Sequence, residues 1–315
     1  MTSVQMVGVI FGIMLVFMAL RVPIAISMFV AGAYGYIAQT GWLPFANFLN
    51  NQAFARFASY DLSVIPLFIL MGHFATQGGI SKALFDFAAG VMGRFKGGLA
   101  MAAVLACAAF GAICGSSVAT AATITGVALP ELKRHGYSGR LATGTLAAAG
   151  TLGILIPPSV PLVVYAILTE QNIAKLFLAA FIPGILAALG YVLTISIYVR
   201  LYPDAAGTRP PVPMAERFKA LAQTWPVMAI FMMVVGGIYL GWFTPTEAAA
   251  IGAAATGLVA LVSGSFGWAI LKQSLIGTAR TTAMIFFIVL GAGFYNGFLA
   301  LSGVPQFMAD WVVGQ

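Results

Sequence analysis

Residues 97–130, GGLAMAAVLACAAFGAICGSSVATAATITGVALP, form an uncharged segment whose length decides the fold. Basic residues lie on both sides of it, namely Arg94 and Lys96 before it and Lys133, Arg134 and Arg140 after it. Because lysine and arginine collect on the cytoplasmic side of a membrane, both ends should lie on one face. Two full spans need about 20 apolar residues each plus a turn, and 34 residues are too few. The segment predicts a re-entrant helical hairpin with Gly115-Ser116-Ser117 at its tip.

The composition of the whole chain is that of a polytopic, all-α membrane protein. Hydrophobic residues make up 61% and charged residues 7%, against roughly 45–50% and about 25% in soluble domains. The net charge of +7 comes from 15 basic and 8 acidic residues. The positive-inside bias explains this excess, and no basic stripe with interleaved aromatic residues is present. The lipid bilayer is therefore the expected surroundings, and nucleic acid is not an expected partner.

Uncharged runs between charged residues predict the membrane topology. Besides the hairpin, spans are expected at 4–20, 22–39, 62–77, 141–169, 176–199, 224–243, 248–268 and 281–302. With the N-terminus outside, only Arg56 and Lys175 of the 15 basic residues lie on the outer side. The proline-rich stretch Arg209–Pro213 predicts an extended cytoplasmic linker.

Two nine-residue segments indicate an internal repeat. Residues 79–87, GISKALFDF, match residues 303–311, GVPQFMADW, in the glycine, an aliphatic residue, the aspartate and an aromatic residue. The predicted topology places the first segment inside and the second outside, as an inverted repeat requires. The pattern predicts a second hairpin beyond residue 315, so the chain is expected to stop before that hairpin.

A second unusual segment, residues 150–161 with the sequence GTLGILIPPSVP, should break its helix. Proline has no backbone N–H, so Pro157, Pro158 and Pro161 leave three carbonyls without helical donors, those of Gly153, Ile154 and Pro157. Together with hydroxyls at the hairpin tip, these carbonyls could bind a dehydrated monovalent cation. A proline kink satisfied by neighbouring hydroxyls is the alternative.

Two overlapping residue sets follow from this hypothesis. The expected cation ligands are Gly115, Ser116, Ser117, Thr120, Gly153, Ile154 and Pro157. Because the N-termini of broken helices attract anions, an acid should bind close by. Its expected contacts are Ser116, Ser117, Thr151, Pro158 and Ser159.

Three motifs in this order carry a family resemblance: residues 110–120 (FGAICGSSVAT), 153–159 (GILIPPS) and 243–249 (FTPTEAA). They resemble the large membrane subunit of tripartite ATP-independent periplasmic (TRAP) transporters. The resemblance implies import of small organic acids, such as C4-dicarboxylates, coupled to sodium ions across the bacterial inner membrane. It implies two partners, a periplasmic substrate-binding protein and a small four-span membrane subunit. A transporter without catalytic residues or covalent cofactors is expected, not an enzyme.

The resemblance also implies an elevator-type movement and a division of the chain. Residues 1–93 would hold the scaffold spans of the first repeat, and residues 94–169 the hairpin and broken helix of the transport domain. Residues 170–223 would form a span and the cytoplasmic linker, and residues 224–315 the scaffold spans that open the second repeat.

Other classes of function fit the sequence less well. An intramembrane serine protease needs a base beside its serine, but the two histidines, His73 and His135, lie in a predicted span and a predicted cytoplasmic turn. An ion channel is not excluded. A stand-alone sodium–dicarboxylate symporter of related architecture is the nearest alternative, because it would need no binding protein. We expect His73 to be a packing residue and Thr244 with Glu247 to form a helix-capping box.

Overall fold

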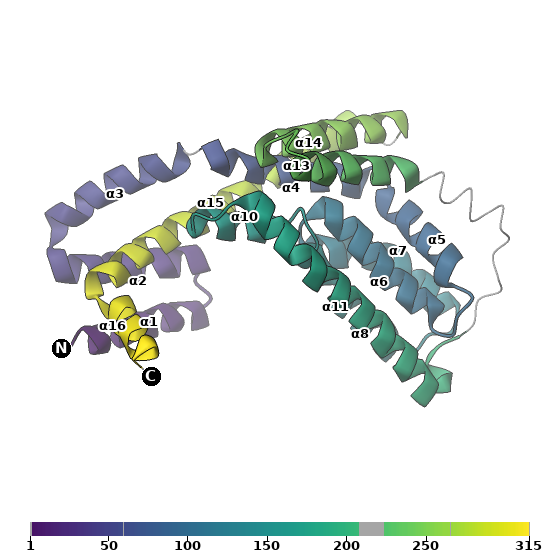
Figure 1. Cartoon of the computed structure of the whole chain (residues 1–315), viewed down its shortest axis with the longest axis horizontal. Helices are drawn as coiled ribbons and strands as arrows, with labels where there is room; N and C mark the ends of the chain where they lie inside the picture. The colour runs from purple at the N-terminus through teal and green to yellow at the C-terminus, as the bar shows by residue number, and fades with distance from the viewer. Residues whose placement is uncertain (1, 59, 208–223, 265, 315) are drawn as a thin grey trace. The chain divides into compact units, whose positions relative to one another are not determined.

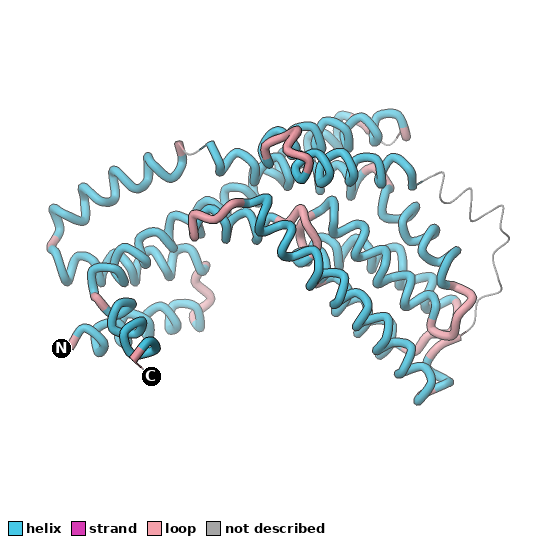
Figure 2. The backbone as a smooth tube through the Cα atoms, viewed as in Figure 1, coloured by secondary structure: helices cyan, strands magenta, loops and turns pink. Residues whose placement is uncertain are grey.

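The computed structural model describes residues 2–58, 60–207, 224–264 and 266–314, and all of their regular secondary structure is helical (Figure 2). The chain forms two compact units: residues 1–60 with 280–315, and residues 61–279. The all-α prediction is confirmed. The predicted linker at 209–213 lies outside the described residues, and the predicted four-part division stays a prediction.

The first unit consists of helices from both ends of the chain. They are α1 (Ser3–Ala19), α2 (Ile24–Thr40), α3 (Trp42–Phe57), the C-terminal part of α15 (Trp268–Ser302), and α16 (Val304–Val313). Its core contains Ile10, Ala31, Tyr295 and Phe298. Gly32 permits this packing, because a Cβ there would lie 2.6 Å from the Tyr295 backbone nitrogen.

The second unit contains the hairpin and the broken helix. In chain order, it has the 3-10 turn η1 (Tyr60–Ser63), α4 (Val64–Gln77), α5 (Ile80–Met92), α6 (Gly98–Cys114), α7 (Ser117–Arg134), α8 (Gly139–Gly150), α9 (Leu152–Leu155), α10 (Val160–Leu168), α11 (Ile173–Leu201) and the 3-10 turn η2 (Pro203–Ala205). A helix over 224–239 follows, with a π-helical stretch η3 (Met232–Gly236) and a last turn α13 (Gly237–Tyr239), and then α14 (Pro245–Val262). Figure 1 labels these helices.

The predicted hairpin is present as α6 and α7, which pack against each other. Gly115 ends α6 in the left-handed conformation (φ 63°), which favours glycine. Ser116 begins α7 by accepting a hydrogen bond from the Ala119 N–H at 3.4 Å. From Ser117 to Pro130 the helix rises about 20 Å, less than the roughly 30 Å of a bilayer core. The fold therefore agrees with a re-entrant element, and the depth of its tip in the membrane stays a prediction.

Tyr137 closes the open end of the hairpin. Its buried hydroxyl accepts a hydrogen bond from the backbone N–H of Leu99, in the first turn of α6, at 3.2 Å. Burial raises the pKa of the Tyr137 phenol, so this group stays neutral at physiological pH. Nearby, the Ser138 hydroxyl caps α8 by accepting from the Leu141 N–H at 3.3 Å. These bonds tie the base of the hairpin to the start of the next helix.

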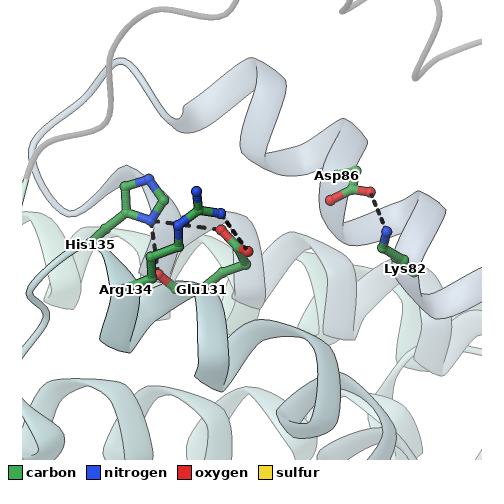
Figure 3. Close-up of polar contacts among 5 residues, drawn as sticks. All are labelled: Lys82, Asp86, Glu131, Arg134 and His135. Atoms are coloured by element: carbon green, nitrogen blue, oxygen red, sulfur yellow. Dashed lines mark hydrogen bonds and ion pairs between the residues drawn. The ribbon is translucent and has the colours of Figure 1, made fainter.

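Charged side chains gather at the same end of α7, as Figure 3 shows. Glu131 lies 3.7 Å from Arg134 and 3.7 Å from the ring of His135. On α5, Lys82 lies 4.0 Å from Asp86. An exposed ion pair such as Lys82–Asp86 stabilises a fold by only about 0–1 kcal/mol. The charged group on α7 marks the polar end of the hairpin.

The predicted helix break is confirmed. Helices α8 to α10 bend by 43° around residues 156–159, and the Pro157–Pro158 peptide bond is cis. By length and composition, α11, α14 and α15 are each able to cross a membrane. Counting each bent pair as one span gives up to five within the described residues, where α1, α2, α6 and 224–239 are shorter apolar helices.

Some helices differ in extent from the predicted spans, whose positions in a membrane stay predictions. Helix α15 begins at Trp268, before the predicted span at Thr281, because the exposed side chains of Lys272 and Arg280 leave the helix intact although they interrupt the uncharged run. After Gln77 the chain bends by 67° and continues as α5. The uncharged runs therefore predicted where helices lie but not where each helix begins and ends.

Three smaller predictions can be compared with the structure. The Thr244 N–H donates to Glu247 at 2.8 Å, and the Glu247 N–H donates to Thr244 at 3.3 Å, so the capping box is confirmed. His73 is hydrogen-bonded to the backbone of Gly277, which fits a packing residue. Gly79 and Gly303, the first residues of the proposed repeat, are both left-handed N-caps, with φ of 72° and 68°. The inverted relation between the repeats stays a prediction.

Cysteines at Lys96 and Arg134, exposed residues on the two flanks of the hairpin, should react with an impermeant thiol reagent from the same membrane face. The native Cys107 and Cys114 are buried and should first be replaced by alanine. Labelling of intact cells and of inverted vesicles provides the measurement. Reaction from opposite faces would rule out a hairpin.

Candidate functional site

The hairpin tip and the helix break form one local structure. The backbone N–H of Val160 donates to the carbonyl oxygen of Gly115 at 3.3 Å. A Cβ on Gly115 would lie 2.9 Å from the carbonyl oxygen of Pro158. Gly115 and Val160 are 45 residues apart in sequence, and they bring the two motifs into direct backbone contact.

Glycines allow this close approach. A Cβ on Gly111 would lie 2.5 Å from the Cα of Gly153, and one on Gly150 would lie 2.5 Å from the Cβ of Ala121. A Cβ on Gly153 would overlap the Thr120 hydroxyl oxygen. Small residues let helix backbones pack tightly in a membrane, where contact replaces the hydrophobic effect as the driving force. These glycines thus position the hairpin against α8 and α9.

Neutral oxygen atoms converge where Gly153 meets the hairpin. The Thr120 hydroxyl is fully buried, and no oxygen or nitrogen atom of the described residues is hydrogen-bonded to it; its neighbour is the Cys114 thiol, a weak hydrogen-bonding group. The carbonyl oxygen of Ser116 is close as well, 2.7 Å from the position of a Cβ on Gly153. A buried hydroxyl without a partner costs about 1–3 kcal/mol. Hydroxyl and carbonyl oxygens of this kind can replace part of the hydration shell of a monovalent cation.

The break uses some of its freed backbone groups internally. The hydroxyl of Ser159 donates to the carbonyl oxygen of Ile154 at 2.7 Å, in place of the donor that Pro158 lacks. The alternative of a kink satisfied by a neighbouring hydroxyl therefore holds for this carbonyl. Pro157, Pro158 and Ser159 are all buried. Their roles as ligands stay predictions.

A groove with a volume of about 620 Å³ runs between α7 and α8, beside the tip. Its hydroxyl-bearing residues are Ser117, Thr125, Thr143 and Thr151, and its other lining residues are Val118, Ala121, Ala122, Leu146, Ala147 and Gly150. The first two residues of α7, Ser117 and Val118, open onto it. The groove therefore combines hydroxyls with the positive end of a helix dipole.

The sequence analysis named Ser117 and Thr151 but missed Thr125 and Thr143. All four follow helical spacing, since Thr125 lies eight residues after Ser117 and Thr143 lies eight before Thr151. This spacing could have identified both residues once two facing helices were assumed. The Thr151 hydroxyl also donates to the Ala148 carbonyl at 2.7 Å and lies 3.0 Å from the Tyr191 hydroxyl of α11.

No cluster of potential metal ligands competes with this site in the described parts of the chain. Within them, no group of three or more histidine, cysteine, aspartate or glutamate residues is placed to hold a metal ion. The two cysteines, Cys107 and Cys114, are buried and do not form a disulfide. The chemistry available at the tip and break is therefore that of neutral oxygens and backbone groups.

Comparison with known proteins decides the family. The sequence pattern described as "Tripartite ATP-independent periplasmic transporter, DctM component" matches residues 11–315. The chain belongs to the DctM family of TRAP transporters. The resemblance carried by the three sequence motifs is thereby confirmed. Membership also supports a multi-pass membrane protein.

Three relatives show how much of a DctM protein is shared. The chain is 39% identical to the C4-dicarboxylate TRAP transporter large permease protein DctM of Pseudomonas aeruginosa over 84% of this chain and 62% of that protein. It is 31% identical to the corresponding protein of Rhodobacter capsulatus over 97% and 72%. It is 31% identical to the sialic acid TRAP transporter large permease protein SiaM of Vibrio cholerae over 97% and 71%. The chain thus spans between about three fifths and three quarters of these relatives.

Replacing Gly153 by alanine should destabilise the DctM-family chain by about 1–3 kcal/mol, because the new Cβ overpacks against Thr120 and the Ser116 carbonyl. Gly126 is a matched control on α7, since a Cβ there meets nothing within 4 Å. Gly126→Ala should leave stability unchanged or raise it by about 0.5–1 kcal/mol, as expected within a helix. Thermal unfolding of the purified proteins measures both effects. If Gly153→Ala unfolded at the same temperature as the wild type, the tight packing around Gly153 would be contradicted.

Proposed function

We propose that this chain is the large permease subunit of a sodium-coupled TRAP transporter that imports small organic acids across the bacterial inner membrane. A periplasmic substrate-binding protein would deliver the acid, and a small four-span membrane subunit would complete the membrane part. The observation that carries the proposal is the contact of tip and break around the buried Thr120 hydroxyl. Family membership supplies the transport class.

The sodium ion would bind between the tip and the break. The Thr120 hydroxyl and the Ser116 carbonyl supply two neutral oxygens beside Gly153. Gly115, Ser117, Ile154 and Pro157 remain as candidate further ligands from the same two segments. Neutral ligands favour a monovalent cation, because nothing in these segments offsets the desolvation of a second positive charge.

The acid would bind in the groove beside this ion. Its carboxylate would meet the N-terminus of α7 at Ser117 and Val118, where backbone N–H groups and the helix dipole favour an anion. The hydroxyls of Thr125, Thr143 and Thr151 would orient the rest of the molecule. The relatives named above transport C4-dicarboxylates or sialic acid, which are all carboxylates. A carboxylate is therefore the substrate feature that we assign.

Ion and acid would be coupled because they share the start of α7. Ser116 and Ser117 are adjacent, and one contributes to the cation site while the other lines the groove. Binding sodium would fix the tip and add a positive charge next to the carboxylate. Helices α6 to α10 would then move as one elevator-type transport domain, with the N-terminus of the chain on the periplasmic side.

Replacing Thr120 by valine should weaken sodium binding several-fold, since the loss of one neutral ligand makes the free energy of sodium binding less favourable by about 1 kcal/mol. The substitution keeps the side-chain shape and removes a hydroxyl that has no oxygen or nitrogen partner among the described residues, so the fold should persist. Thr120→Ser, which keeps the oxygen, is the matched control. The measurement is the rise in unfolding temperature as sodium chloride replaces choline chloride. An identical sodium response of the wild-type chain and Thr120→Val would contradict the cation site.

Uptake in proteoliposomes tests the whole proposal. Radiolabelled C4-dicarboxylates and sialic acid should accumulate only with an inward sodium gradient, the small subunit and a binding protein on the outside. Uptake that needs neither partner would instead identify a stand-alone sodium–dicarboxylate symporter. Current without sodium dependence would identify a channel.

A further inference from the structure

A second groove, with a volume of about 210 Å³, lies on a different side of α8 from the proposed transport site. It runs between α8 and α11 and is floored by Val104 of α6. On α8, Leu141, Gly144 and Thr145 line it, whereas Leu146, Ala147 and Gly150 line the transport groove. The two grooves therefore use neighbouring sides of α8.

The groove is mostly apolar, with Thr145 and Thr194 among its middle residues and larger polar side chains at its ends. Helices α8 and α11 run in opposite directions, so Tyr191, whose hydroxyl lies 3.0 Å from that of Thr151, marks one end. Arg140 and Tyr198 mark the other end. The ring of Tyr198 lies 5.0 Å from that of Tyr202, one turn further along α11. Tyrosines beside a basic residue are typical of a membrane–water interface.

The dimensions fit one leaflet of a bilayer. From Arg140 to Ala148 the helix rises about 12 Å, and half of a hydrocarbon core is about 15 Å. Only 11% of the most apolar stretch of α11 is buried inside the protein, so most of this helix is exposed on the protein surface. An acyl chain that enters beside Arg140 could therefore follow the groove through most of a leaflet.

Arg140 supplies the charge complementarity. Its side chain is exposed, and among the described residues no acidic group lies within ion-pair distance of it. A guanidinium group binds a phosphate through two parallel hydrogen bonds. By the charge topology, this end of α8 lies on the cytoplasmic side, and basic pockets between helices on that side bind anionic lipid headgroups.

We propose that this groove binds one anionic phospholipid from the cytoplasmic leaflet, with an acyl chain between α8 and α11 and its phosphate on Arg140. The lipid would contact one side of α8, and another side of α8 lines the transport groove. This inference does not depend on sodium coupling or on the identity of the acid.

Native mass spectrometry of the purified membrane protein, exchanged into mixtures of phosphatidylglycerol and phosphatidylcholine, tests the charge contact. Wild-type protein should retain phosphatidylglycerol in preference to phosphatidylcholine. Arg140→Gln should lower this preference about tenfold, the effect of losing one charge-assisted hydrogen-bonded pair. Arg200→Gln is the control, since Arg200 is also basic and exposed, lies near the same end of α11, and does not line the groove. If Arg140→Gln and Arg200→Gln lost the preference for phosphatidylglycerol equally, the lipid would be attracted only by the general positive charge of this region, and the proposal would be overturned.

The acyl-chain contact has its own test. A Cβ on Gly144 meets nothing within 4 Å, so Gly144→Leu should fill the groove without disturbing the fold. Retention of both lipids should fall in this variant. Gly126→Leu adds the same side chain at an equally open position of α7, outside the groove, and should retain lipid like the wild type. Unchanged retention in Gly144→Leu would place the lipid elsewhere.

Discussion

Backbone hydrogen bonding inside hydrocarbon is the constraint on which this structure depends. A helix that ends within the membrane exposes N–H and C=O groups, and each unsatisfied group costs several kcal/mol. In the predicted topology, the hairpin tip and the helix break each contain such ends. The N–H of Val160 in the break reaches the carbonyl of Gly115 at the tip, and within the break the hydroxyl of Ser159 reaches the carbonyl of Ile154. Together the tip and the break form the interior structure on which the proposed binding sites are built.

Close packing makes this exchange possible. Gly111, Gly150 and Gly153 let the hairpin approach α8 and α9 within distances that any side chain would prevent. Packing at such short range also buries the Thr120 hydroxyl fully, and a buried polar group normally has a hydrogen-bond partner. The same helix, α8, has threonines toward one groove and an arginine toward another, so packing and recognition occur on one short element.

Local patterns in the sequence predicted the hairpin and the break, because each follows from a run of neighbouring residues. The length of the uncharged segment and its basic flanks defined the hairpin, and three prolines defined the break. Contacts between distant segments could not be predicted in this way. The hydrogen bond from Leu99 to Tyr137, the opposition of Gly111 and Gly153, and the position of Thr125 opposite Thr143 all depend on how helices face each other. The start of α15 was missed because exposed charges such as Lys272 do not interrupt a helix.

The two segments around the proposed site, residues 110–120 and 153–159, contain no charged side chain. If these segments hold ion and acid as proposed, they add no charge of their own to the cargo. The membrane potential would then act at this site on the cargo alone, at about 2.3 kcal/mol for each elementary charge per 100 mV. A site that holds more sodium ions than carboxylates would be driven inward by the potential, whereas the empty site would add no electrical cost to the return.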